Sequence, residues 1–201
     1  MRTKRSQALA LALFTVFYNL LEGAVAIFGA STSGSQALLG FGLDSFIESL
    51  SGMVIIWRFW KFAPDEETED FERVEQRAER LVGYTFFILG AYISFDAGAA
   101  LLWQQAPETS LIGIALAAVS VLVMPVLFLL KFRLGQKIQS RSLIADSKET
   151  LACVFLSVAL LIGLGAHYLW GLWWLDPVTA LIIAVLIVRE GFETLGESAD
   201  D

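Results

Sequence analysis

The chain has 201 residues, of which 56% are hydrophobic, and its mean hydropathy is +0.65. Soluble domains average about 45–50% apolar residues, whereas the apolar residues here come in runs of about 20, each long enough as a helix to cross roughly 30 Å of hydrocarbon. The net charge of −7 comes largely from acids in residues 64–79 and 190–201, and no basic cluster is interleaved with aromatics, which excludes a nucleic-acid partner.

Six apolar segments predict an all-α bundle of six transmembrane helices in a single domain, 1–201. The expected bounds are 8–30, 36–60, 82–104, 110–132, 143–166 and 174–192. The first segment is longer than the roughly 7–15 apolar residues of a signal peptide, so we interpret it as a membrane helix. Residues 65–80 predict a helical lead-in to the third span, with Glu69 and Arg73 spaced to pair. We expect no C-terminal cytoplasmic domain after the sixth helix.

Basic residues are confined to alternate connections. All 14 Lys and Arg lie at the N-terminus, in or beside the connections 61–81 and 131–141, or at Lys148 and Arg189. Positively charged residues mark the cytoplasmic side of a membrane protein, so both termini are expected in the cytoplasm. We expect a multi-pass protein of the cell membrane, with the bacterial inner membrane as the first expectation.

Two acids fall inside the second predicted helix, where a charged side chain at the bilayer centre costs about 2.5–3.5 kcal/mol on insertion scales. Asp44 and Glu48 are four residues apart, so they share one helix face about 6 Å apart along the axis. Their mutual repulsion is relieved by a divalent cation between them or by protonation of one of them. This spacing predicts a site that exchanges a metal ion for protons.

The fifth predicted helix repeats the spacing with Glu149 and Cys153. Two such pairs packed face to face would supply four metal ligands, and mixed oxygen and sulfur donors in a tetrahedral arrangement fit Zn²⁺. Calcium and magnesium prefer six or more oxygens, whereas Fe²⁺, Mn²⁺ and Co²⁺ stay open. The metal is expected as transported ion, with no resident cofactor. Plainer alternatives are that Cys153 is a small apolar filler and that Glu149, beside Lys148, is a solvated helix start.

Other polar residues have less specific patterns. Glu22 in the first helix is expected either to handle protons near the metal or to hydrogen-bond with Asn19 or another helix. Asp96 lies nearer the outer end of the third helix, where it is either solvated or an outer part of the same pathway. His167 falls in an outer connection and is interpreted as a surface residue rather than a ligand.

Three stretches resemble the cation diffusion facilitators, a family of metal transporters. Residues 33–44, SGSQALLGFGLD, resemble the start of that family's second helix, S-G-S-x-A-L-x-x-D. Residues 143–147, LIADS, resemble the L-x-A-D that opens its fifth helix. Residues 176–184, DPVTALIIA, followed by REG at 189–191, resemble its sixth helix. In order and spacing the resemblance covers nearly the whole chain.

The resemblance implies a transporter of zinc, or in some members of iron, manganese or cobalt, that works outward in exchange for protons. The family's transport site falls on Asp44, Glu48, Glu149 and Cys153, with Asp146 as a further neighbouring or proton-handling group. Helix five here offers E-x-x-x-C where the family has H-x-x-x-D, and the family's cytoplasmic domain is not matched. The resemblance also implies a homodimer within the bilayer.

Two alternatives remain beside the exporter. The altered motif on helix five favours a metal sensor or a partner subunit that does not itself transport. Asp44 and Glu48 could also mimic the paired aspartates of an intramembrane hydrolase, but no glycine-flanked catalytic signature accompanies them. The sequence therefore predicts a protein that is not an enzyme.

Overall fold

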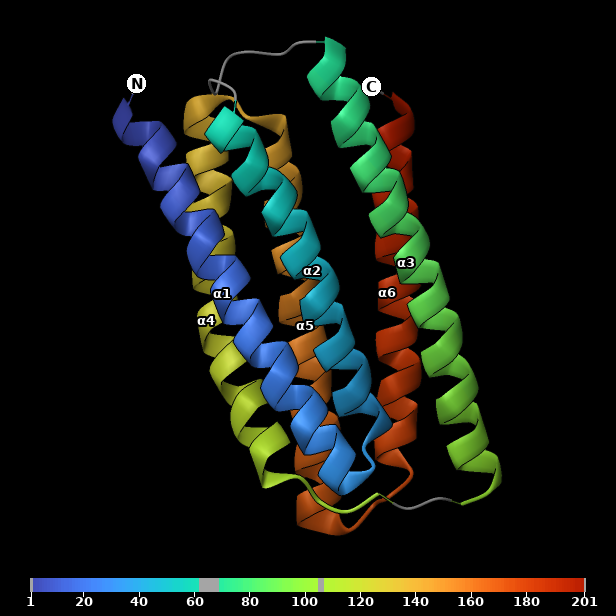
Figure 1. Ribbon diagram of the computed structural model, residues 1–201. Helices are drawn as coiled ribbons and strands as arrows, with labels where there is room; N and C mark the ends of the chain where they lie inside the picture. The colour runs from blue at the N-terminus through green and yellow to red at the C-terminus, as the bar shows by residue number, and fades with distance from the viewer. Residues whose placement is uncertain (1, 62–68, 105–106, 201) are drawn as a thin grey trace.

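The computed structural model describes residues 2–61, 69–104 and 107–200, which are helical nearly throughout (Figure 1). Within these ranges the helices are α1 (Arg2–Ser33), α2 (Gln36–Lys61), α3 (Glu69–Leu102), α4 (Leu111–Ile138), α5 (Arg141–Trp170) and α6 (Leu175–Asp200). The prediction of an all-α bundle of six helices is confirmed. Both termini lie at the same end of the bundle, as six successive crossings require.

Five helices of the described chain contain a segment long and apolar enough to cross a membrane. These segments are Ser6–Ser33, Gln36–Trp57, Gly83–Leu102, Leu111–Ile138 and Asp146–Trp170. The apolar part of α6 also contains Asp176, Arg189 and Glu190, so its composition is less extreme, but it packs along α3 over much of its length (Figure 1). The chain is a multi-pass membrane protein.

Several helices extend beyond their expected bounds. The lead-in to the third span is helical from Glu69, while residues 62–68 and the side chains of Glu69 and Arg73 lie outside the described part. The expected connection 131–141 is wrong for most of its length, because α4 continues to Ile138. A left-handed residue, Gln139, and the N-cap Ser140 then make the turn into α5. Lys131 is therefore a helical residue.

The helices pack chiefly as three pairs, α1 with α2, α4 with α5, and α3 with α6. Contacts from α2 and α5 to α6, and from α2 to α3, join the third pair to the other four helices. The core between them is apolar and includes Phe41, Met124, Leu160 and Ile183, all fully buried. Large apolar side chains cover the outside, as expected for a surface in contact with lipid.

Small residues allow α1 and α2 to approach closely. A Cβ atom on Gly23 would lie 2.9 Å from the carbonyl oxygen of Gly42, and one on Gly42 would lie 3.2 Å from that of Gly23. Close packing through small residues is the usual way in which helices associate inside a bilayer. The two glycines thus fix the spacing between the first two helices.

The start of α2 is held by the start of α6. The Ser35 hydroxyl donates to Asp176, and the backbone N–H of Gln36 donates to Asp176 Oδ2 over 3.0 Å. Ser35 in turn accepts from the N–H of Leu38. These bonds satisfy amide groups that a helix N-terminus leaves without intrahelical partners. They join the DPVTALIIA stretch of α6 to the SGSQAL stretch at the start of α2.

Candidate functional site

The two acids of α2 lie inside the protein, as their spacing predicted. Asp44 is 6% exposed and Glu48 is 4% exposed. One turn of α2 separates them, so their carboxylates act on each other electrostatically. Side chains of α4, α5 and α6 also lie near these two acids.

The predicted ligands on α5 face the same region. The Cys153 thiol is 1% exposed and lies beside Glu48. Glu149 is half-buried, takes a hydrogen bond from Ser51 of α2, and is an electrostatic neighbour of Glu48. The structure thus places Glu48 and Cys153 together, with Asp44 and Glu149 nearby. Within the described residues no three His, Cys, Asp or Glu side chains converge tightly enough to form a metal-binding group.

A further acid comes from α6. Glu190 is an electrostatic neighbour of both Asp44 and Glu149. It was read in the sequence as part of the acidic tail and was not proposed for the site. The sequence did offer one signal for Glu190: it belongs to the REG stretch at residues 189–191, which resembles the sixth helix of the family. The acidic region therefore has contributions from α2, α5 and α6.

A buried cation lies at one side of this region. Lys131 fell where the expected fourth helix (110–132) and the expected connection (131–141) overlap, and in the structure its side chain lies on the inner face of α4 and is 0% exposed. Its Nζ is 2.9 Å from Asp146 Oδ2 and 3.9 Å from Glu48 Oε1. Nζ also donates to the Thr150 hydroxyl over 2.8 Å, and that hydroxyl donates to Glu48 Oε1 over 2.8 Å. Asp146, proposed from sequence as a neighbouring group, is the ion-pair partner of a lysine.

Glu22 lies in a polar cluster between α1, α2 and α4, and it is an electrostatic neighbour of Asp44, Glu48 and Cys153. Its carboxylate accepts a hydrogen bond from Ser45 over 3.0 Å and another from Ser120. Ser120 also lies 3.2 Å from the Tyr18 hydroxyl. The alternative partner Asn19 is fully buried, and its amide atoms make no hydrogen bond to any described residue. Glu22 therefore bonds to other helices rather than to Asn19.

Two other residues lie away from the acids of α2. Asp96 is partly exposed and lines a cavity of about 350 Å³ near the α1–α2 turn, with Ser35 and Gln36. His167 was expected on the surface in a connection, and this was wrong, because α5 extends to Trp170 and buries His167 to 6% exposure. Neither residue joins the group around Glu48.

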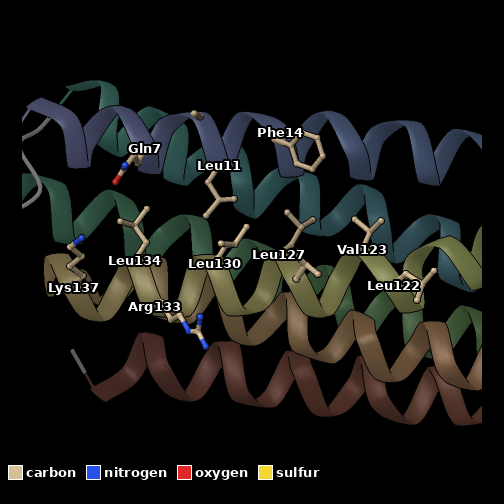
Figure 2. A pocket seen from close by; sticks show the side chains of 12 residues that line it. Gln7, Leu11, Phe14, Leu122, Val123, Leu127, Leu130, Arg133, Leu134 and Lys137 are labelled. Atoms are coloured by element: carbon tan, nitrogen blue, oxygen red, sulfur yellow. The ribbon is translucent and has the colours of Figure 1, made fainter.

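An apolar groove lies on the surface between α1 and α4 (Figure 2), with a volume of about 820 Å³. Leucine, valine and phenylalanine side chains line most of it. Gln7, Arg133 and Lys137 lie toward one end. None of the candidate metal ligands lines this groove, so it is distinct from the acidic region.

Lys131 lies on the same face of α4 as the other buried residues of that helix. The buried residues follow one another at three- and four-residue intervals, the spacing of a single helix face: Gly113, Ala117, Ser120, Met124, Leu127, Lys131 and Gly135. The small members of this row mark where α4 meets its neighbours, and Lys131 falls on the same row.

Comparisons with known proteins agree with the membrane architecture. A family model described as the cation efflux transmembrane domain matches residues 12–201. The manganese efflux system protein MneS of Bacillus subtilis is 24% identical over 191 residues, which are 94% of this chain and 66% of that protein. The cation-efflux pump FieF of Shewanella oneidensis is 26% identical over 164 residues, which are 80% of this chain and 55% of FieF.

A vertebrate protein is similar over the same region. Transmembrane protein 163 of Xenopus laevis is 23% identical over 192 residues, which are 95% of this chain and 67% of that protein. The chain thus spans between about half and two thirds of the length of the curated relatives it matches.

Proposed function

The chain belongs to the cation efflux family, whose members are transporters and not enzymes, and we propose that it exports divalent metal ions, with Zn²⁺ as the first candidate. The observation that carries the proposal is the pair Asp44 and Glu48, buried one turn apart on a helix long enough to cross the membrane. Buried acids inside a membrane are functional by default, and a pair on one face suits a divalent cation.

The donor set of the site consists of Asp44, Glu48, Glu149 and Cys153. Glu48 and Cys153 lie side by side, and the proposal requires the carboxylates of Asp44 and Glu149 to move toward them when a metal ion binds. A thiolate among carboxylates favours Zn²⁺ over Ca²⁺ or Mg²⁺. Mn²⁺ is the second candidate ion, because the oxygen donors suit it and because the relative MneS is named for manganese efflux.

Protons are the proposed counter-ion. The same carboxylates that hold the metal accept protons when it leaves, so metal release on one side and proton uptake are coupled through shared groups. The charge bias of the connections supports an orientation with both termini in the cytoplasm. Outward metal transport would then be accompanied by inward proton movement. A dimer formed through the membrane helices is part of the proposal.

The test is zinc flux in sealed proteoliposomes under an imposed proton gradient. Wild type is compared with Asp44→Asn, which removes one acid of the pair, and with Asp96→Asn, which changes an acid that lies away from the pair. We expect flux that requires the gradient, is abolished by Asp44→Asn and survives Asp96→Asn.

The same assay distinguishes the alternative function. A metal sensor or partner subunit would bind Zn²⁺ in detergent with the same donors but show no flux of Zn²⁺, Mn²⁺ or Fe²⁺. Tight binding without any flux would therefore overturn the exporter and support the sensor. Flux that is equal in wild type and Asp44→Asn would place the site elsewhere.

A further inference from the structure

Lys131 is an unusual residue to find buried beside the proposed metal ligands. Its side chain is fully buried, whereas Lys137, less than two turns further along α4, is exposed. A buried ammonium is costly unless anions and hydrogen bonds compensate it. The compensation here is specific, because Asp146, Thr150 and Glu48 all lie within 4 Å of Nζ.

These contacts tie the lysine to a proposed metal ligand. Glu48 Oε1 takes the Thr150 hydrogen bond and lies 3.9 Å from Nζ. Glu48 Oε2 is buried and makes no hydrogen bond to the described residues. One oxygen of Glu48 is thus shared with the cation on α4, and the other is free to face a second cation.

Two cations that share one carboxylate compete for it. A divalent ion bound at Glu48 would lie within a few ångström of the ammonium, where repulsion is strong because the surroundings are poorly solvated. Asp146 is the nearer partner of the ammonium, with Oδ2 2.9 Å from Nζ, whereas Glu48 Oε1 lies 3.9 Å away. The lysine can therefore withdraw from Glu48 without losing its counter-charge.

We propose that Lys131 is the internal counter-cation of the empty transporter: its ammonium neutralises Glu48 when no metal is bound and withdraws toward Asp146 when metal arrives. The inference rests on the function proposed above. A metal-free site with several buried carboxylates is costly to move through the membrane. Protons taken up on metal release neutralise part of this charge, and Lys131 neutralises the part that Glu48 carries. Lys131 lowers that cost for the return step, and it weakens metal binding enough for release. It is a positioning residue that acts through Glu48.

The proposal predicts a separation of two transport modes. Net efflux requires the empty protein to return across the membrane, whereas metal–metal counterflow moves only the loaded form. In Lys131→Met we expect net zinc efflux to fall about tenfold, counterflow to persist, and zinc to bind about tenfold more tightly, because a competing charge is gone. Lys131→Arg keeps the charge and should restore the wild-type ratio of the two modes. Lys137→Met, a change at an exposed lysine, is the matched control.

The experiment combines proteoliposome flux in both modes with zinc titration calorimetry on purified protein. The double variant Lys131→Met with Asp146→Asn removes both partners of the ion pair and provides a second test should Lys131→Met alone not fold. It should also bind zinc more tightly and lose net efflux. Equal loss of both modes with unchanged affinity, in whichever of these variants folds, would overturn the proposal and leave Lys131 a structural residue.

Failure of the exporter itself has a different signature. If wild type shows no flux, the proposed function fails, and calorimetry still decides whether Lys131 competes with metal at Glu48. Unchanged zinc affinity in Lys131→Met and in the double variant would then overturn the competition as well.

Discussion

Lys131 Nζ lies 2.9 Å from Asp146 Oδ2, and both side chains are almost wholly removed from solvent. The two residues come from α4 and α5, on either side of the tight turn at Gln139 and Ser140. The ion pair therefore holds the C-terminal part of α4 against the N-terminal part of α5, beside the acidic region.

This ion pair gives a prediction for stability. Lys131→Met leaves Asp146 buried without its partner, and breaking a buried pair by removing one member costs about 3–5 kcal/mol. We expect a clearly lower thermal unfolding midpoint in detergent, followed by intrinsic tryptophan fluorescence. Adding Asp146→Asn should recover part of the loss, since it removes the orphaned charge. Additive losses in the double variant would contradict the pairing.

Close packing between α5 and α6 gives a second prediction. A Cβ atom on Gly163 would lie 2.8 Å from Thr179 Cβ, closer than packed atoms approach. Gly163→Ala should destabilise the protein by about 1–3 kcal/mol through overpacking. Gly165→Ala is the control on the same helix, because a Cβ atom there meets nothing within 4 Å. It should be neutral or slightly stabilising, since alanine favours helix by about 1 kcal/mol. Thermal unfolding of the two variants side by side checks the difference.

The hydrogen bonds between the start of α2 and the start of α6 give a third prediction. Asp176→Ala removes the acceptor of both the Ser35 hydroxyl and the Gln36 N–H. Loss of such capping bonds costs about 0.5–2 kcal/mol. We expect a lower unfolding midpoint and faster hydrogen exchange at the first amides of α2, measured by mass spectrometry. Exchange that is unchanged at those amides would show that the bonds do not hold the helix start.

The Cys153 side chain either binds the metal ion or only packs in the core, and the Cys153→Ser variant separates these roles. The serine keeps the size nearly constant but replaces a soft donor with a hard one. If the thiol binds metal, zinc affinity should fall about tenfold or more while manganese affinity changes little. Competitive titration with a fluorescent chelator measures both. Equal affinities for zinc in the two proteins would identify Cys153 as a packing residue.

The proposed orientation is testable with two single cysteines in a Cys153→Ala background. Lys137→Cys is exposed at one end of α4, and Glu108→Cys is exposed before the other end of that helix. With the termini in the cytoplasm, a membrane-impermeant maleimide added to intact cells should label position 108 and spare position 137. Inverted vesicles should show the reverse. Labelling in the opposite sense would place both termini outside.

The six helices were predictable because each carries a long apolar run, and the burial of Asp44 and Glu48 followed from their position within one such run. The role of Lys131 was not predictable in the same way. It lies near the end of an apolar helix, where a lysine ordinarily reaches toward the membrane surface. Because α4 is apolar all round, its periodicity does not reveal which face meets the bundle. Only the packing against α5 turns this lysine inward.

How the proposed ligands on α2 and α5 lie relative to one another could not be predicted from the sequence either. Spacing of four residues places Asp44 with Glu48 and Glu149 with Cys153 on common helix faces. It does not determine how α2 and α5 are rotated and shifted against each other. In the structure that packing brings Glu48 to Cys153 and adds Glu190 from α6, which no local pattern on α2 or α5 could indicate.

The hydrogen bonds that Ser35 and Gln36 donate to Asp176 hold the start of α2 against α6, so that α2 can tilt about this point. When a helix tilts about one end, that end moves least and the opposite end moves most. With a rise of about 1.5 Å per residue, Glu48 lies about 18 Å along α2 from Gln36, so a tilt of about 10° displaces it by about 3 Å. That displacement is comparable to the length of a metal–ligand bond. A small tilt about the start of α2 would therefore change the distances between the acids of α2 and those of α5.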